Sequence, residues 1–337
     1  MRPTRRPIAA VALVALAAPL LAACGGEEKP SLVVYNAQHE ELIDVVAKEF
    51  TKETGIEVQL RNGSDLELGN QLATEGDASP ADVFLTENSP AMTLVDQEGL
   101  FAELDATTLD QIPEQYRPDD GQWTGFAARS TVMVYNTDQV SEDELPTSIM
   151  DLAKPEWRDR ISFSPTGADF QAIVSAVLAT QGTAATREWL AGLKTNGTVY
   201  DGNNVVLESV NSGEKPAGVI YHYYWYRDQE ESGENSDSSQ LHFFEDGDPG
   251  AFISVSGAGV LESSDDAEDA QKFVEYLVSP KGQQVIADSY ALEYTLNPEV
   301  DLGRDVRPLS DLSPPDVDVS ELSSPEVTEL MQEAGFL

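Results

Sequence analysis

Apolar residues along this chain fall into short buried runs and longer runs with helical spacing. Residues 31–35 (SLVVY) and 56–60 (IEVQL) are rich in apolar and β-branched side chains, which predicts two strands. Between them, apolar residues from Leu42 to Phe50 follow helical spacing, and Gly55 ends the pattern. A strand, a helix and a strand within about 30 residues predict a βαβ unit with a parallel sheet and a right-handed crossover.

The same alternation continues to the end of the chain. Further strands are predicted at residues 81–85, 131–135, 217–221 and 252–255, and helices at 170–180, 184–193 and 267–278. The polar segment 230–240 (EESGENSDSSQ) predicts a solvated loop. Strands alternating with helices indicate an α/β fold, and the length suits two domains with cores of their own.

The N-terminus has the layout of a signal peptide. Three arginines within the first six residues precede an uncharged apolar run over residues 8–23, which is shorter than the roughly 20 apolar residues of a spanning helix. Residues 21–24 (LAAC) resemble the bacterial lipobox, which predicts removal of residues 1–23 and lipidation of Cys24. Residues 24–30 then form a tether. Cys24 is the single cysteine, so no intramolecular disulfide can form.

The charge balance is strongly acidic. The formal net charge is −40, and loss of Arg2, Arg5 and Arg6 with the signal peptide makes it −43. Such a surface repels nucleic acid and anionic lipid, which excludes a polyanion-binding role. It favours either attraction of cations or simple solubility, and charge alone does not decide between them.

Four side chains that can bind a metal follow predicted strands. His39 follows the strand that ends at Tyr35, Glu87 follows residues 81–85, and Tyr223 and Tyr224 follow residues 217–221. In open parallel sheets, ligands bind beyond the carboxyl ends of the strands. Three strands therefore deliver an imidazole, a carboxylate and two phenols to one edge.

This donor set favours a hard, highly charged cation. A free tyrosine has a pKa near 10, so two phenolates at neutral pH need a strong Lewis acid such as Fe(III). Neutral His39, Glu87 and two phenolates supply three negative charges against three positive charges. Each residue also has a structural alternative: His39 and Glu87 as residues at helix starts, and the run 221–226 as an aromatic core patch.

Several segments resemble the ferric-ion-binding solute receptors of bacterial ABC importers. These are YNAQHEE, ADVFLTEN and YHYYWY at residues 35–41, 81–88 and 221–226, with WRDRISFSPTGADF, DPGAFISVSGAGVL and KFVEYLVSPKGQQVI. The resemblance covers nearly all of residues 31–337. It implies iron ligation by His39, Glu87, Tyr223 and Tyr224.

The resemblance also implies a fold and its domain limits. The expected fold is the two-lobed, type II periplasmic-binding-protein fold, in which each lobe is a mixed or parallel sheet flanked by helices. The N-terminal lobe would comprise residues 31–129 plus 254–304, and the C-terminal lobe 130–253 plus 305–337. The chain would cross the hinge more than once, and the lobes would close over the ligand.

Many relatives hold a synergistic anion beside the iron, and this sequence departs from their pattern. The resemblance assigns the anion or outer-shell positions to Asn88, Arg129, Thr166, Gly167, Ala168, Asp169, Asn203 and Tyr221. Asp169 adds a negative charge, and the Asn that is common before the tandem tyrosines is missing. We therefore expect carbonate rather than phosphate, or completion of the iron shell by water or Tyr221.

The predicted function is an extracytoplasmic, monomeric receptor that captures Fe(III) and delivers it to an ABC permease and its ATPase. Its lipid would hold it to the outer face of the cell membrane. The main alternative is a receptor of the same fold for an organic cation such as a polyamine or thiamine. A metal-dependent hydrolase and a surface adhesin are further alternatives. The sequence has three histidines and no G-x-S-x-G turn, so a non-enzymatic role is favoured.

Overall fold

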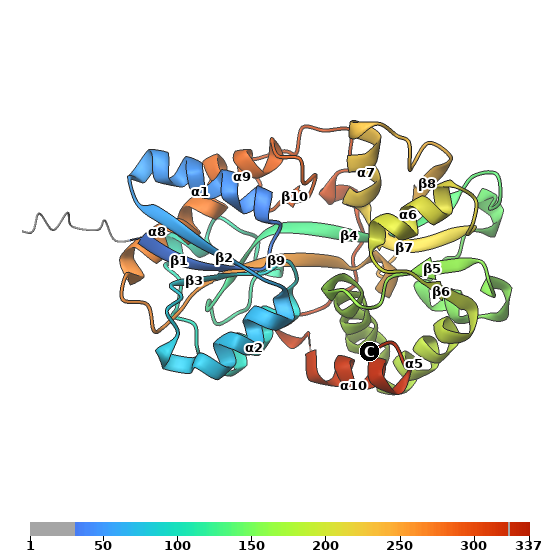
Figure 1. Ribbon diagram of the computed structural model, residues 1–337, viewed down its shortest axis with the longest axis horizontal. Helices are drawn as coiled ribbons and strands as arrows, with labels where there is room; N and C mark the ends of the chain where they lie inside the picture. The colour runs from blue at the N-terminus through green and yellow to red at the C-terminus, as the bar shows by residue number, and fades with distance from the viewer. Residues whose placement is uncertain (1–30, 323) are drawn as a thin grey trace, which may run out of the picture.

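The computed structural model describes residues 31–322 and 324–337, so the predicted signal peptide, Cys24 and the tether lie outside the described residues. Figure 1 shows helices packed around a long sheet that runs through the molecule. The strands are β1 (Ser31–Asn36), β2 (Glu57–Asn62), β3 (Val83–Leu85), β4 (Thr124–Asn136), β5 (Ile161–Phe163), β6 (Gly197–Val199), β7 (Ala217–Tyr221), β8 (Ser239–His242), β9 (Ile253–Val260) and β10 (Tyr294–Thr295). The helices are α1 (Glu40–Thr54), α2 (Asp65–Glu75), α3 (Ser89–Gln97), α4 (Ala106–Leu109), α5 (Ala168–Asn196), α6 (Asn203–Asn211), α7 (His222–Glu231), α8 (Ala267–Val278), α9 (Pro280–Ala287) and α10 (Ser324–Glu333).

The first half of the sheet contains the predicted βαβ unit. β1 pairs in parallel with β2 on one side and with β3 on the other, and α1 joins β1 to β2. α1 ends at Gly55, which has a φ of 77°. Glycine adopts this left-handed conformation without a Cβ clash, so Gly55 stops the helix where the sequence pattern predicts.

The strand order continues through β9 and β4 into the second half, as β2-β1-β3-β9-β4-β7-β5-β6. β4 is the central element, because its first half pairs with β9 and β10 and its second half with β7 and β8. The sequence predicted a strand over residues 131–135 alone, whereas β4 has 13 residues. Its first half was missed because the small and polar segment TGFAARS gives no strand pattern.

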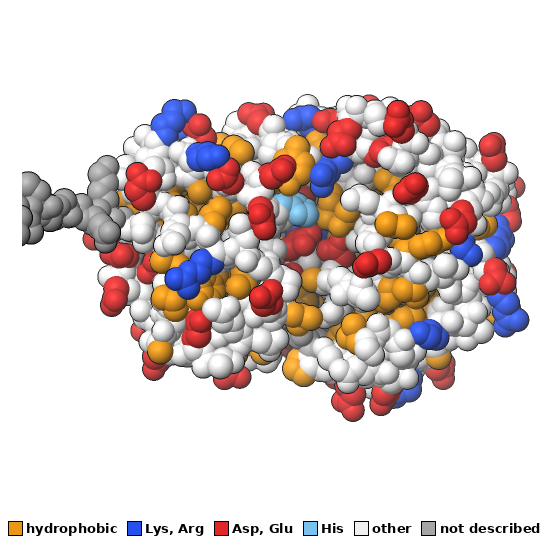
Figure 2. All heavy atoms as spheres, in the orientation of Figure 1, with side chains coloured by type: hydrophobic (Ala, Val, Ile, Leu, Met, Phe, Trp, Pro, Cys, Tyr) orange, Lys and Arg blue, Asp and Glu red, His pale blue; other side chains and the backbone are white. Residues whose placement is uncertain are grey.

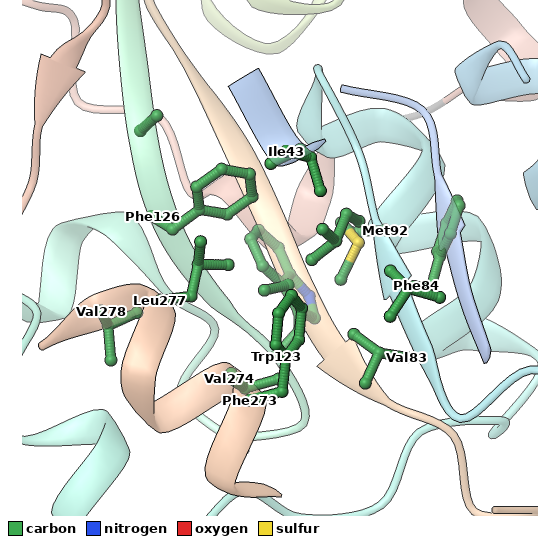
Figure 3. Packing of buried hydrophobic residues seen from close by; sticks show 14 of the residues in the cluster. Ile43, Val83, Phe84, Met92, Trp123, Phe126, Phe273, Val274, Leu277 and Val278 are labelled. Carbon is green, nitrogen blue, oxygen red and sulfur yellow. The ribbon is translucent and has the colours of Figure 1, made fainter. Parts of the chain in front are cut away.

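The two largest hydrophobic cores lie one in each lobe. The first contains residues from α1, β3, the start of β4 and α8, and Figure 3 shows Trp123, Phe126 and Phe273 packed together inside it. The second contains residues of β5, α5, β7 and α10, among them Trp189. Burial of each such aromatic side chain contributes about 1.5–3 kcal/mol. The exact lobe boundaries inferred from the sequence remain predictions.

Two further predictions concern helices and loops. Helices predicted at residues 170–180 and 184–193 correspond to α5, and Gly182 breaks the regular helix between them with a φ of 78°. The segment 230–240 is a loop in its middle only, because it begins in α7 and ends in β8. Within the described residues, no helix is both long and apolar enough to cross a membrane.

Candidate metal site between the lobes

The four predicted ligands sit where strands end and helices begin. His39 follows β1 and occupies the N-cap position of α1 without a side-chain capping bond, and Glu87 lies between β3 and α3. Tyr223 and Tyr224 form the first turn of α7, directly after β7. The sharp strand-to-helix transitions aim these side chains beyond the carboxyl ends of the strands, where ligands bind in open α/β sheets.

The structure brings these side chains together from both lobes. The hydroxyl of Tyr223 donates a hydrogen bond to Glu87 Oε1 at 3.3 Å, and His39 Nε2 lies 3.8 Å from the same oxygen. The rings of Tyr223 and Tyr224 stack with centroids 4.2 Å apart, and His39 meets Tyr223 edge-on at 5.5 Å. Imidazole nitrogen, carboxylate and phenol oxygens therefore converge on one small space.

The aromatic run that holds the tyrosines is partly structural. Tyr221 and His222 are fully buried, and the ring of His222 stacks on Tyr294 of β10 with centroids 4.3 Å apart. Burial lowers the pKa of His222 to about 3, and its Nδ1 accepts a hydrogen bond from the backbone of Ser130. His222 is thus a neutral core residue, whereas Tyr223 and Tyr224 face the cleft.

Burial sets the protonation of the ligand group. It raises the pKa of Tyr223 and of Tyr224 well above the ordinary value of 10, and neighbouring carboxylates add to the effect. It also raises the pKa of Glu87 to about 7, although Arg129 opposes the shift. Burial lowers the pKa of His39. Without a cation, the phenols are neutral at physiological pH, and the imidazole is free to bind through a nitrogen lone pair.

A second layer of polar side chains fixes the loop that carries Glu87. Asp65, at the start of α2, accepts hydrogen bonds from the backbone N–H groups of Glu87 and Asn88 at 2.9 and 3.0 Å. Arg129 of β4 donates to the carbonyl of Glu87 and to Asn88 Oδ1, the latter at 3.3 Å. Ser254 of β9 donates to the same Asn88 oxygen at 2.7 Å. The loop is therefore tied to both central strands.

The positions assigned to an anion are held together by Asp169. Asp169 lies in the first turn of α5, where its Oδ2 accepts from Asn203 Nδ2 at 2.8 Å and from the Tyr224 hydroxyl at 3.1 Å. The Tyr221 hydroxyl donates to the backbone carbonyl of Asp169 at 3.2 Å. Burial raises the pKa of Asp169 to about 7. Thr166 and Gly167 are exposed just before α5, and Ala168 begins the helix.

Two carboxylates near the ligands were not predicted from the sequence. Glu293, just before β10, is fully buried, and its Oε1 lies 3.4 Å from His39 Nε2. Asp65 is almost fully buried, and burial raises its pKa to about 7. Glu293 follows no predicted strand, and Asp65 follows the mostly exposed strand β2, whose side chains gave no sign of a buried site. From the sequence alone, the acidic residues around Asp65 indicate the start of a surface helix. Glu293 is indicated only as an acidic residue in a turn.

The space among these residues is strongly acidic. Figure 2 shows acidic side chains gathered around a histidine in the hollow between the two lobes. Among the described residues, no group of three His, Cys, Asp or Glu side chains is arranged to hold a metal ion. A cation bound here would therefore depend on phenol oxygens as well as on the carboxylates and the imidazole. This donor set suits a hard, trivalent ion.

Two α/β lobes that share central strands and direct polar side chains into the space between them define a two-lobed solute-binding protein. The chain belongs to the family of bacterial extracellular solute-binding proteins, whose model matches residues 78–308.

Named relatives cover nearly the whole chain. It is 54% identical over 306 residues to the Fe(3+)-binding periplasmic protein of Serratia marcescens, covering 91% of this chain and 90% of that protein. It is 38% identical over 326 residues to the major ferric iron-binding protein of Neisseria meningitidis serogroup A, covering 94% and 97%. The crystal structure of iron-bound HitA from Pseudomonas aeruginosa matches with a TM-score of 0.85 and 37% identity, over 90% of this chain and 99% of that one. The predicted fold and family are thereby confirmed.

Proposed function

We propose that this chain captures Fe(III) in the cleft between its lobes and delivers it to an ABC permease and its ATPase. One observation carries the proposal: His39 and Glu87 from one lobe meet two stacked tyrosines of the other. The names of its relatives, which denote ferric-binding proteins, support the same cargo. Binding to both lobes at once would hold the cleft closed around the ion.

The proposed first ligands are His39, Glu87, Tyr223 and Tyr224. Phenolate and carboxylate are hard oxygen donors, and a trivalent cation can displace the phenol protons that burial otherwise retains. Neutral His39 with three anionic oxygens matches the charge of Fe(III). The contacts of 3.3 Å between Tyr223 and Glu87 and of 3.8 Å between His39 and Glu87 are close to the roughly 3 Å spacing of neighbouring ligands on one ion. The donor set and the ferric-binding names of the relatives favour a metal ion over the organic-cation alternative.

Asp169 is our candidate for the place that an anion takes in other receptors. Asn203 and Tyr224 already donate to its Oδ2, and Asn88 Nδ2 lies 3.4 Å from its Oδ1. An added carbonate would compete with this carboxylate for the same donors and would meet its charge. We therefore propose that Asp169, rather than carbonate or phosphate, takes the anion's place in the iron shell, where its charge replaces that of the anion, with Tyr221 as a neutral hydrogen-bond donor outside the shell.

The absorption spectrum of the iron-loaded protein tests the cargo. Phenolates bound to Fe(III) give a visible charge-transfer band, which we expect for the wild type and expect to disappear when Tyr223 and Tyr224 are both replaced by Phe. Tyr200→Phe, which changes a phenol bonded to Glu214 away from the cleft, is the matched control. A colourless wild-type protein, or full iron binding by the double variant, would refute the proposal.

Anion dependence is tested separately. Wild-type protein is loaded from ferric nitrilotriacetate in buffer stripped of carbonate and phosphate, and its affinity is compared with that in either anion. We expect equal affinities, and we expect Asp169→Asn to become dependent on added carbonate. A wild type that binds iron only when carbonate is present would show that the anion, not Asp169, is the ligand.

The cellular setting is also a proposal. Cleavage before Cys24 and its lipidation would hold a monomeric receptor on the outer face of the membrane. Tethering there raises the effective concentration of the receptor at its permease. Cys24→Ser should move the protein from the membrane to the soluble fraction. The lobes are proposed to comprise residues 31–129 plus 254–304 and residues 130–253 plus 305–337. Closure of these lobes over the ion should make the protein more compact on iron loading, which X-ray scattering measures.

A further inference from the structure

Glu293 is a buried carboxylate with only one of its two oxygens hydrogen-bonded within the described residues. Its side chain is fully buried, and Oε2 accepts hydrogen bonds from Arg129 at 2.8 Å and from Gln38 Nε2 at 3.2 Å. Oε1 has no hydrogen-bond partner among residues 31–322 and 324–337. A buried acceptor without a partner is costly, and in native proteins it calls for a specific explanation such as an unseen ion.

The unpartnered oxygen points at a second unpartnered atom. His39 Nε2 is also buried and forms no hydrogen bond within the described part of the chain, and it lies 3.4 Å from Glu293 Oε1. Bonds of about 2.1 Å from a small cation to nitrogen and oxygen place neighbouring ligands about 3 Å apart. The 3.4 Å separation is therefore closer to that of two ligands on one ion than is the 3.8 Å between His39 and Glu87.

The backbone before Glu293 is held in an unusual conformation. Leu292 has a φ of 54°, in the left-handed region that non-glycine residues rarely adopt. Its side chain packs in the second core, while Ala291 and Tyr294 pack in the first. The Leu292 side chain thus reaches the second core from a segment that packs in the first, and the next residue, Glu293, contacts His39 and Arg129 where the two lobes meet. Strain of this kind is retained where the surrounding structure demands it, often at functional sites.

We propose that Glu293 is a further protein ligand of the cleft, and that its Oε1 binds the same cation as His39 Nε2. The inference rests on the proposed binding of Fe(III). Arg129 supplies the positive charge that offsets the added carboxylate, and with Gln38 it fixes Oε2 so that Oε1 stays aimed at the ion. Arg129 also donates to the carbonyl of Glu87, so it links two ligands of the same ion.

Spectroscopy separates coordination from a structural role. Glu293→Gln replaces an anionic donor by a neutral one, which leaves the iron more electron-poor. We expect the phenolate-to-iron band to move to longer wavelength and the affinity to fall by more than about 100-fold, beyond the roughly 10- to 100-fold typical of residues outside the coordination shell. Glu299→Gln, an exposed glutamate on the same segment, is the matched control and should leave band and affinity unchanged.

The alternative is that Glu293 only pairs with Arg129. In that case Glu293→Gln lowers the melting temperature but leaves the band where it is, and that result overturns the inference. If the single variant does not fold, the double variant Arg129→Gln/Glu293→Gln removes the buried pair together. Its band is compared with that of Arg129→Gln, because Arg129 also contacts Glu87, and only the additional shift is assigned to Glu293. If the wild type shows the band and the variant band is not shifted, coordination by Glu293 is refuted while the proposed function stands. If the wild type is colourless, the proposed function and this inference are refuted together.

Discussion

Iron loading should expel protons, and their number follows from the metal-free site. The pKa values of Tyr223 and Tyr224 lie well above 10, so each phenol carries a proton at pH 8 that a ferric ion must displace. Glu87 and Asp169 each have a pKa of about 7, so both are mostly ionised at pH 8 and mostly protonated at pH 6. We expect release of about two protons per iron at pH 8 and about four at pH 6.

The affinity for the free ferric ion should therefore rise with pH. Each displaced proton raises the binding constant for the ferric ion by a factor of 10 per pH unit. The two phenols therefore account for about four orders of magnitude of that constant between pH 6 and pH 8. Glu87 and Asp169 titrate within this window and add about one order each. The sign is fixed because all four groups bind protons in the metal-free protein and lose them to iron. The total is about six orders of magnitude, or about 8 kcal/mol.

Calorimetry measures the proton count directly. Ferric nitrilotriacetate is titrated into the protein in two buffers with different ionisation enthalpies, and the proton balance of the chelate alone is subtracted. Tyr224→Phe should release one proton fewer at both pH values, and Tyr200→Phe should match the wild type. Release of less than one proton at pH 8, with an affinity that does not change with pH, would refute binding through phenolates.

Two predictions concern stability, each measured by urea unfolding of the metal-free protein. Arg129→Gln leaves Glu293 buried without its cation and should cost about 3–5 kcal/mol. Arg187→Gln breaks an exposed pair with Glu333 and should leave the stability nearly unchanged. Phe273→Ala opens a cavity in the first core and should cost about 3–5 kcal/mol, against less than about 0.5 kcal/mol for exposed Val45→Ala. Equal losses within either pair would contradict the reasoning.

The predicted ligands could be found from the sequence because each one directly follows a strand with a clear apolar pattern. β1, β3 and β7 are short, buried runs, and the rule that ligands lie beyond their carboxyl ends needs no knowledge of tertiary structure. Chemistry then narrowed the choice, since adjacent tyrosines with an imidazole and a carboxylate suit few cations. The structure places these four residues together, and their role as iron ligands remains a prediction.

The residues that escaped sequence reasoning are those positioned by long-range contacts. Glu293 gains its place from the strained Leu292 and from Arg129, which is 164 positions away along the chain. Asp65 gains its place from the backbone of Glu87, 22 positions away. The first half of β4 was missed for a similar reason, because it becomes a strand by pairing with β9 and β10, and its small and polar residues show no local strand pattern. Local periodicity carries no information on such contacts.

The metal-free contacts suggest how protons and iron exchange. The bonds from Tyr223 to Glu87 and from Tyr224 to Asp169 need phenol protons, and the first of them joins side chains of different lobes. Protons thus hold the oxygens near the positions that a cation would occupy, so iron binding replaces O–H···O hydrogen bonds by bonds to the same oxygens. Because the same groups regain protons when iron leaves, release costs less free energy at low pH. A permease that opens the lobes would then need to separate hydrogen-bonded side chains rather than bare, repelling charges.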